Sequence, residues 1–261
     1  LYFHKLFRTL MMGNIIVKVS DLHKSFRDVK VLSGVNIDIE EGKVTTIIGK
    51  SGTGKSVLLK NIIGIMKPDM GEIFFKDIDI TKLSDHELLA IRRNIGYLFQ
   101  DAALFDFMNV EENIAFPLVE QLGIKDGKLL KERVAKLLDL IELPGIEKKY
   151  PSELSGGMRK RVGLARAIAV EPKIVLFDEP TTGLDPILAE SINTLIMKVN
   201  KELGMTCVVI SHDIASTFRR ADKVALLYDG TIQFFGEPAK AVVSDHPVLK
   251  QFISNSFRPL E

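Results

Sequence analysis

Cysteine, net charge and long apolar runs are all scarce in this chain of 261 residues. The one cysteine, Cys207, excludes an internal disulfide or a cysteine-based metal site; its apolar surroundings predict a buried strand residue in a reducing, cytoplasmic setting. A formal net charge of +1 gives no support for nucleic-acid binding. Charges or glycines interrupt the apolar stretches well before the roughly 18 residues that a membrane-spanning helix requires. The remaining composition, 46% hydrophobic and 26% charged, is that of an ordinary globular protein.

No repeat or low-complexity tract divides the chain, and its length permits one large α/β domain or two small ones. Residues 1–12 are set apart as a tag, an upstream segment or a flexible N-terminal segment, because a chain that begins with leucine favours a later start at Met11 or Met12. An amphipathic membrane contact is the alternative for this segment. Residues 13–261 are expected to form one folded domain.

Short apolar runs mark the expected strands. The runs in the C-terminal half are almost continuously apolar, as expected for parallel strands buried on both faces, and helical patterns separate them. Helical patterns also dominate from about residue 101 to 170, which defines a helical subdomain. The pattern predicts a doubly wound α/β core with an N-terminal strand-rich layer and a helical insertion. The expected strands are residues 14–22, 30–39, 43–49, 72–75, 95–100, 173–179, 206–211 and 223–228.

Local signals also place the ends of several helices. A helix is predicted from Lys55 to about Met66, where a turn with proline and glycine follows. Ser84 and Glu87, three residues apart, form a capping box that begins another helix. Two short helices are expected near the C-terminus, before an irregular tail.

The segment "GKSGTGKS", residues 49–56, follows an apolar strand and opens a helix, which is the context that a phosphate loop requires. Its glycines let backbone N–H groups converge on phosphate oxygens without a Cβ in the way. Lys55 is placed to contact the β- and γ-phosphates, and the hydroxyl of Ser56 to ligate Mg²⁺. An ordinary glycine turn is the alternative, and the strand–loop–helix context disfavours it. The residues assigned to the nucleotide here are Gly49, Lys50, Ser51, Gly52, Thr53, Gly54, Lys55, Ser56 and Val57.

Two carboxylates follow the apolar run "KIVLF". Asp178 ends a buried strand, where a carboxylate is costly unless it serves an ion, and it is assigned to Mg²⁺ through a water molecule. Glu179 comes next, points elsewhere and is the candidate for polarising the attacking water. An isolated Asp-Glu pair is more often part of a solvated loop, but the upstream phosphate loop reverses that weighting.

Three further residues gain weight only beside these motifs. Gln100 ends a strand where its side chain can reach the metal and the water. His212 follows an apolar strand and is a candidate donor to the γ-phosphate, although a lone histidine there is more often a helix cap or a core residue. Phe26 lies in the turn-like "KSFRDVK" and is a candidate stacking surface for adenine, although most phenylalanines are core residues.

A second turn suited to an anion lies in "SELSGGMRKR", residues 152–161. Ser155 is a good N-cap, Gly156 and Gly157 allow close backbone approach, and the helix N-terminus behind them favours anions. The basic run at 159–161 is predicted to be a solvated helix face. A nucleic-acid contact is disfavoured there because no aromatic residues interleave.

Together and in this order, these motifs resemble those of the ATP-binding subunit of ATP-binding cassette (ABC) transporters, from about Ile15 to the mid-200s. The resemblance implies a P-loop NTPase fold with a RecA-like core, and ATP hydrolysis with Mg²⁺. It also implies a head-to-tail pair of chains. ATP then lies between the phosphate loop of one copy and the signature turn, residues 154–158, of the other.

The resemblance adds one residue and contains two departures. Asp185, in "GLDP", would sit beside the same seam between the two copies. Met158 and Val57 stand where the family more often has glutamine and threonine. Met158 lies beyond the serine and glycines proposed to hold phosphate. ATP binding is therefore expected to survive the departure at Met158. Val57 is less polar than the usual threonine and can tune the site, but Ser56 keeps the hydroxyl that the metal requires.

Residues 99–118 resemble the ATPases of Mce-linked systems that move phospholipids across the bacterial envelope, the Mla type in particular. The resemblance implies three partners: a second copy, transmembrane permease subunits and an Mce-domain protein. It implies a peripheral place on the cytoplasmic face of the inner membrane. In such ATPases this region meets a coupling helix of the permease, and its apolar residues suit a helix in a groove; packing inside the helical subdomain is an equally weighted alternative. These residues are Leu104, Phe105, Phe107 and Met108.

Four other functions are alternatives to a lipid-transport ATPase. An importer ATPase for another substrate, such as a polar amino acid, stays open. A soluble DNA-repair ATPase is disfavoured because no sustained heptads separate the phosphate loop from the signature turn. A translation-factor relative would carry two cassettes where this chain has one. A non-hydrolysing regulator is disfavoured by Glu179.

Overall fold

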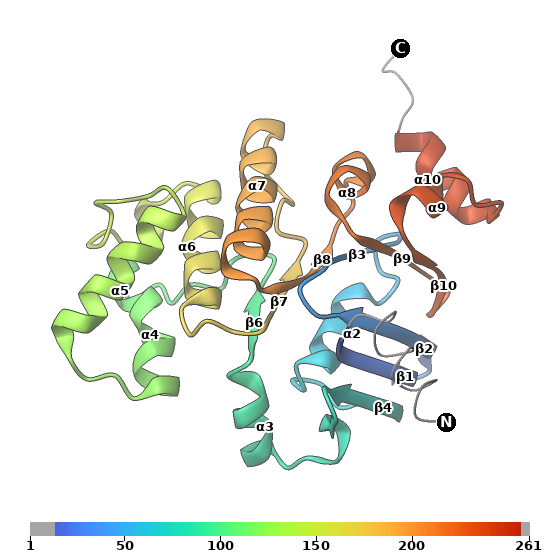
Figure 1. Ribbon diagram of the computed structural model, residues 1–261, viewed down its shortest axis with the longest axis horizontal. Coiled ribbons are helices and arrows are strands. Elements are labelled where there is room, and N and C mark those ends of the chain that lie inside the picture. Colours follow the sequence, from blue (N-terminus) through green and yellow to red (C-terminus); the bar gives the residue numbers. More distant parts are fainter. Residues whose placement is uncertain (1–13, 257–261) are drawn as a thin grey trace, which may run out of the picture.

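Two β-sheets organise residues 14–256, the part of the chain described by the computed structural model (Figure 1). The smaller sheet has the strand order β2-β1-β4-β5, and all its neighbours pair antiparallel. The predicted boundary at residue 12 lies outside the described residues. The strands of this sheet are β1 (Ile15–Phe26), β2 (Val29–Glu40), β4 (Met70–Phe75) and β5 (Ile78–Asp79).

The larger sheet holds the parallel strands, in the order β10-β9-β3-β8-β7-β6. All neighbours pair parallel except β10, which pairs antiparallel with β9. Every residue of β3, β7 and β8 is buried, as expected for parallel strands covered on both faces. The strands are β3 (Val44–Ile48), β6 (Ile95–Leu98), β7 (Ile174–Asp178), β8 (Thr206–Ile210), β9 (Lys223–Tyr228) and β10 (Thr231–Gly236).

The register of the large sheet brings several strand ends to one edge. Ile210 at the end of β8 pairs with Asp178 at the end of β7 and with Ile47 near the end of β3. Ligand sites of parallel sheets form beyond such carboxyl ends. The segments after β3, β6, β7 and β8 therefore emerge side by side.

Helix α2 (Lys55–Ile62) packs between the two sheets, where Leu58 and Leu59 share one apolar core with β1, β2 and β3. Helices α4 (Val110–Leu122), α5 (Gly127–Leu140) and α6 (Gly156–Ile168) form a separate group on the left in Figure 1, around their own apolar cluster. The other helices are η1 (Ile80–Lys82), α3 (Asp85–Arg92), η2 (Pro151–Glu153), α7 (Pro186–Leu203), α8 (Ile214–Arg220), α9 (Pro238–Val242) and α10 (Pro247–Ser256).

The predicted fold class is confirmed. A core with a mostly parallel sheet carries an antiparallel layer, built from the N-terminal strands β1, β2, β4 and β5, and a helical insertion. The capping box of α3 is also confirmed, because Ser84 Oγ accepts from Glu87 N and a Glu87 oxygen accepts from Ser84 N at 2.8 Å. Cys207 is buried in β8 as predicted, and burial raises the pKa of its thiol to about 12.

The predicted end of the first long helix is wrong. Helix α2 ends at Ile62, four residues before Met66. Gly64 takes a left-handed φ of 72°, and the N–H of Met66 donates to the carbonyl of Lys60 at 3.1 Å, which is a helix-ending arrangement. Within residues 14–256, no helix has the length and apolar character to cross a membrane.

Candidate functional site

The phosphate loop lies between β3 and α2, at the edge where the parallel strands end. Gly54 has a φ of 93°, and a Cβ at this position would lie 2.7 Å from Val31 Cγ1, so only glycine fits without displacing β2. Thr53 Oγ1 donates to the carbonyl of Lys50 at 2.9 Å. The loop is thus a tight turn whose shape its own side chains support.

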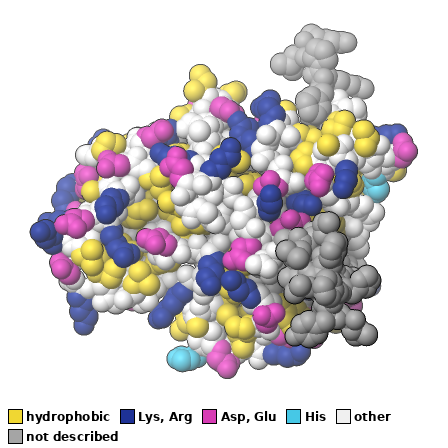
Figure 2. All heavy atoms as spheres, in the orientation of Figure 1, with side chains coloured by type: hydrophobic (Ala, Val, Ile, Leu, Met, Phe, Trp, Pro, Cys, Tyr) yellow, Lys and Arg dark blue, Asp and Glu magenta, His cyan; other side chains and the backbone are white. Residues whose placement is uncertain are grey.

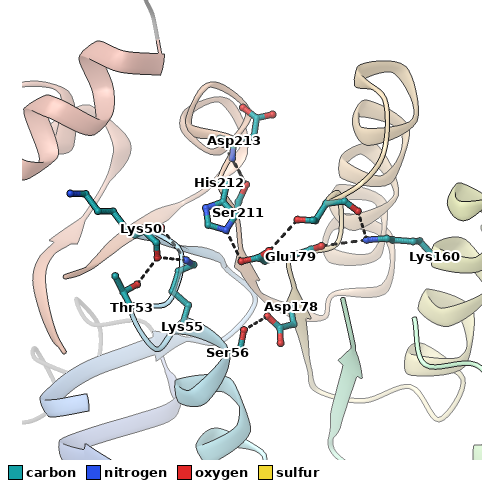
Figure 3. Close-up of polar contacts among 12 residues, drawn as sticks. Lys50, Thr53, Lys55, Ser56, Lys160, Asp178, Glu179, Ser211, His212 and Asp213 are labelled. Atoms are coloured by element: carbon teal, nitrogen blue, oxygen red, sulfur yellow. Dashed lines mark hydrogen bonds and ion pairs between the residues drawn. The ribbon is translucent and has the colours of Figure 1, made fainter. Parts of the chain in front are cut away.

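Lys55 closes this loop from inside (Figure 3). It is only 4% exposed, and its Nζ donates to the carbonyls of Gly49 and Lys50 at 3.0 and 2.9 Å. Burial lowers the pKa of its ammonium, and the carboxylates of Glu179 and Asp178 act in the opposite direction. A positive charge is therefore held within a cradle of backbone groups, as phosphate binding requires.

Asp178 faces this loop from the end of β7 and is 5% exposed. Ser56 Oγ donates to its Oδ1 at 2.6 Å, and the hydroxyl of Tyr97 donates to its Oδ2 at 3.0 Å. The Ser56–Asp178 pair offers hard oxygen ligands, which fit Mg²⁺. The described residues contain no group of three or more His, Cys, Asp or Glu side chains that could form a metal cage.

Glu179 is the next residue and points away from Ser56, toward His212 (Figure 3). Its Oε1 lies 2.6 Å from His212 Nε2, and its Oε2 accepts from Thr182 Oγ1 at 3.1 Å. The backbone of Glu179 has a φ of 50°, a strained value for a non-glycine residue. The Glu179 side chain is 16% exposed and that of His212 is 42% exposed, so this pair lies at the solvent side of the site.

The structure therefore brings five predicted side chains into one cluster on the phosphate loop of residues 49–56, whereas Phe26, Gln100 and Val57 lie outside it. Phe26 ends β1, is 44% exposed and has Lys24 Nζ at 5.9 Å from its ring centroid. Gln100 is exposed, two residues beyond β6. Val57 packs its side chain on the core between the sheets. The clustered residues are Lys55, Ser56, Asp178, Glu179 and His212.

Ser155 is the N-cap of α6, and its Oγ accepts from the N–H of Met158 at 3.3 Å. A Cβ built on Gly157 would lie 3.4 Å from Leu188, so this turn packs on the start of α7. Asp185 caps α7 by accepting from the N–H groups of Ile187 and Leu188 at 3.0 Å. The signature turn and Asp185 are therefore neighbours. Within residues 14–256, no hydrogen bond or ion pair joins the signature turn to the phosphate loop.

The prediction that residues 159–161 form a solvated helix face is wrong for two of the three. Lys160 is 6% exposed, and its Nζ donates to the carbonyl of Thr182 at 2.9 Å. Arg161 donates to the carbonyl of Ile141 at 2.9 Å and to the hydroxyl of Ser191. Backbone carbonyls hold both cations in place of water, and Arg161 also pairs with the carboxylate of Glu142 at 3.1 Å; composition alone does not reveal these contacts.

Sequence reasoning also missed Tyr97 and Thr182, which hold the two carboxylates. Tyr97 lies in "IGYLF", where alternation alone would class it as a strand residue of the core. Thr182 lies three residues after Glu179, a spacing typical of a turn that closes on its own side chain. The Thr182 signal was available in the sequence; the Tyr97 contact spans 81 positions and was not.

A groove of about 620 Å³ lies at the opposite edge of the large sheet, near the amino ends of β7 and β8. Apolar side chains such as Leu137, Leu140 and Met205 line it, with Lys136 and Lys173 at its margin. It shares no residue with the candidate nucleotide site, so it has no part in that site.

The phosphate loop, the Ser56–Asp178 pair and the Glu179–His212 pair together define a P-loop ATPase. The family description "ABC transporter" matches residues 32–182. The chain belongs to the ABC transporter family. As a member, it is an ATPase subunit of a transporter, uses ATP with Mg²⁺, and dimerises.

Three relatives show the range of transporters within that family. The chain is 40% identical to the "probable ribonucleotide transport ATP-binding protein mkl" of Mycobacterium leprae, over 94% of this chain and 70% of that protein. It is 39% identical to the "methionine import ATP-binding protein MetN" of Carboxydothermus hydrogenoformans, over 92% and 71%. It is 37% identical to the "intermembrane phospholipid transport system ATP-binding protein MlaF" of Haemophilus influenzae, over 93% and 91%.

A solved structure supports the same family. The ATP-binding cassette MJ0796, in a dimeric post-hydrolysis state bound to ADP and Pi, superposes with a TM-score of 0.78 at 35% identity. The match covers 85% of this chain and 98% of that one.

Proposed function

We propose that this chain is the ATP-hydrolysing subunit of an ABC transporter that moves phospholipids across the bacterial envelope, at the cytoplasmic face of the inner membrane. The observation that carries the lipid assignment is the coverage of MlaF. The alignment spans 93% of this chain and 91% of MlaF, whereas it spans 70% of mkl and 71% of MetN. The resemblance of residues 99–118 to Mla-type ATPases supports the same assignment.

The proposed roles follow from the geometry of the site. Residues 49–56 hold the phosphates through backbone N–H groups and the Lys55 ammonium. Ser56 and Asp178 would hold Mg²⁺, which when bound supplies positive charge against the phosphate oxygens. Glu179 orients and polarises the water that attacks the γ-phosphate, and His212, 2.6 Å from it, contacts the same phosphate.

The remaining candidates complete the site from its margins. The exposed ring of Phe26 stacks on adenine, and Gln100 reaches toward the metal and the water. A second copy supplies the other half, because a γ-phosphate already held by one chain can accept hydrogen bonds from a helix N-terminus of another. The residues proposed for that half are Ser155, Gly156, Gly157 and Asp185.

The proposed contact with the permease is the apolar surface of the helical group. Phe107 is 75% exposed, and Phe105 lies behind it with ring centroids 5.7 Å apart. Figure 2 shows hydrophobic side chains gathered over this helical group. Leu104, by contrast, packs into the core, so the four apolar residues of this loop divide between surface and interior. Further exposed apolar residues of α4 are Phe116, Val119 and Leu122.

The test is purification of the tagged chain from native membranes, with identification of what binds. Recovery of a multi-pass permease together with an Mce-domain protein is expected. Recovery with an amino-acid-type permease would overturn the lipid assignment and favour an importer of the MetN kind.

The matched variants for this test are Phe107→Glu and Val243→Glu. Both residues are highly exposed, at 75% and 78%, but Val243 lies after α9, outside the helical group. Phe107→Glu is expected to lose the permease because it puts a charge into an apolar contact. Val243→Glu is expected to retain it. Equal recovery with both variants would exclude Phe107 from the interface.

A further inference from the structure

Lys160 is a buried cation, and no carboxylate within residues 14–256 forms an ion pair or hydrogen bond with it. It lies in the second turn of α6 and is 6% exposed. Its Nζ donates to the carbonyl of Thr182 at 2.9 Å and lies 3.5 Å from the carbonyl of Glu179 (Figure 3). Burial lowers the pKa of this ammonium, and the carboxylates of Asp101 and Glu179 oppose that effect. A buried charge is costly, so its retention here calls for a role.

Both acceptors belong to one tight turn, residues 179–182, which we name the Glu179 turn. The N–H of Thr182 donates to the carbonyl of Glu179 at 3.2 Å, and its hydroxyl donates to the Glu179 carboxylate at 3.1 Å. Glu179 itself has a φ of 50°, which costs about 1 kcal/mol or more for a residue with a Cβ. The hydrogen bonds within the turn stabilise this strained backbone conformation. They thereby fix the direction in which the Glu179 carboxylate points.

Helix α6 is a firm support for such a contact. Arg161, the next residue, donates to the carbonyl of Ile141 at the end of α5 and to the hydroxyl of Ser191 on α7. Ser155 caps the same helix at its N-terminus. One rigid helix therefore carries the signature turn at its start and holds the Glu179 turn one and a half turns later.

The geometry points to Lys160 as a positioning residue that holds the Glu179 turn of its own chain against α6. In the head-to-tail pair, on which this step rests, α6 presents Ser155 to the ATP of the other copy. Lys160 then links the closure of α6 on that ATP to the orientation of Glu179 at the chain's own ATP.

The first test is steady-state ATP hydrolysis by Lys160→Met, which keeps the length and loses the donors. We expect kcat to fall about tenfold or more while the KM for ATP changes less than about twofold, because orientation of the water is lost and the phosphate loop is untouched. Lys160→Gln, whose amide can donate to one carbonyl, should recover part of kcat. Lys201→Met, an exposed charge loss at the end of α7, is the control and should match the wild type.

The decisive test uses heterodimers with one working Glu179. One chain carries Glu179→Gln, and Lys160→Met is added either to that chain or to the chain with intact Glu179. We expect loss of turnover only when Lys160→Met lies in the chain with intact Glu179. Loss only in the opposite arrangement would mean that Lys160 acts through the signature turn, and equal loss in both would mean general damage to the fold. Either result, or no loss in either arrangement, overturns the assignment.

Ser155→Arg in the same heterodimers tests the pairing independently. It should abolish turnover when placed on the Glu179→Gln chain, and lower it to a smaller extent when placed on the other, where it removes only the closure of α6 that Lys160 transmits. If Ser155→Arg fails to act across the pair while Lys160→Met still acts within its own chain, the head-to-tail site is wrong and the positioning role of Lys160 stands. The link to the other copy's ATP would then fall.

Discussion

At the scale of single residues, the site is a set of buried charges held by neutral donors and acceptors. Lys55 and Asp178 are 4% and 5% exposed. Burial of either charge is costly, and each is stabilised by hydrogen bonds from groups fixed in the fold. Two carbonyls of the phosphate loop accept from Lys55, and two hydroxyls donate to Asp178. The hydroxyl of Tyr97 therefore stabilises the folded state through its hydrogen bond to Asp178.

We expect Tyr97→Phe to lower the free energy of unfolding by about 1–3 kcal/mol, because a hydrogen bond to a charged, buried carboxylate is lost. Burial, and after it the Asp178 carboxylate, raises the pKa of Tyr97, so the phenol is protonated and donates at neutral pH. Urea unfolding measures the change. Tyr150→Phe, at a 45% exposed position, is the control and should change stability by less than about 0.5 kcal/mol. Equal stability of both variants would contradict the assigned bond.

At the scale of secondary-structure elements, the helix starts are the part of the fold that local sequence predicts well. Ser84 caps α3 and Ser155 caps α6 through bonds to residues three positions ahead. Such contacts lie within one turn, so their residue pattern is visible along the chain. The same holds for the parallel strands, whose unbroken apolar runs reflect burial on both faces.

Other contacts could not be predicted because they join residues far apart in sequence. Tyr97 reaches Asp178 across 81 positions, and Lys160 reaches Thr182 from a different element. Only the packing of β6 beside β7, and of α6 beside the Glu179 turn, makes these pairs neighbours. The basic run at residues 159–161 has the same composition whether water or backbone carbonyls surround it. Composition therefore could not show that the predicted solvated helix face was wrong.

The two serine caps offer a matched pair of variants. Ser155→Ala and Ser84→Ala each remove one cap, so each should lower the free energy of unfolding by about 0.5–2 kcal/mol. Only Ser155→Ala should also lower ATP turnover, because only α6 is proposed to present its N-terminus to a phosphate. Thermal unfolding and phosphate release measure the two effects separately.

If Ser84→Ala lowers turnover as much as Ser155→Ala, the loss would reflect stability, and the signature turn would have no specific role. If neither variant lowers turnover while both are less stable, Ser155 would be a cap and nothing more. The distinction is sharp because α3 contributes no residue to the candidate site.

At the scale of the whole molecule, one chain carries two features proposed to bind phosphate, and no hydrogen bond or ion pair joins them within residues 14–256. The phosphate loop joins Asp178 and Glu179 at the carboxyl edge of the sheet. The signature turn packs instead on the start of α7, near Asp185. A chain with both features can use each of them in a pair whose two copies face each other in opposite directions, which is why ATP should act as part of the interface.

ATP should therefore hold the pair together when hydrolysis is blocked. Glu179→Gln keeps the phosphate loop and the Ser56–Asp178 pair, so it should bind ATP, hydrolyse it at least about a hundredfold more slowly and elute as a dimer in ATP and Mg²⁺. Without nucleotide it should elute as a monomer, because ligand binding supports only the state that it contacts. Adding Ser155→Arg puts a bulky cation where the helix N-terminus would approach phosphate, and the double variant should still bind ATP but remain a monomer. A double variant that dimerises as well as Glu179→Gln would show that the signature turn does not close the site. A double variant that fails to bind ATP would show that the signature turn acts with the phosphate loop of its own chain.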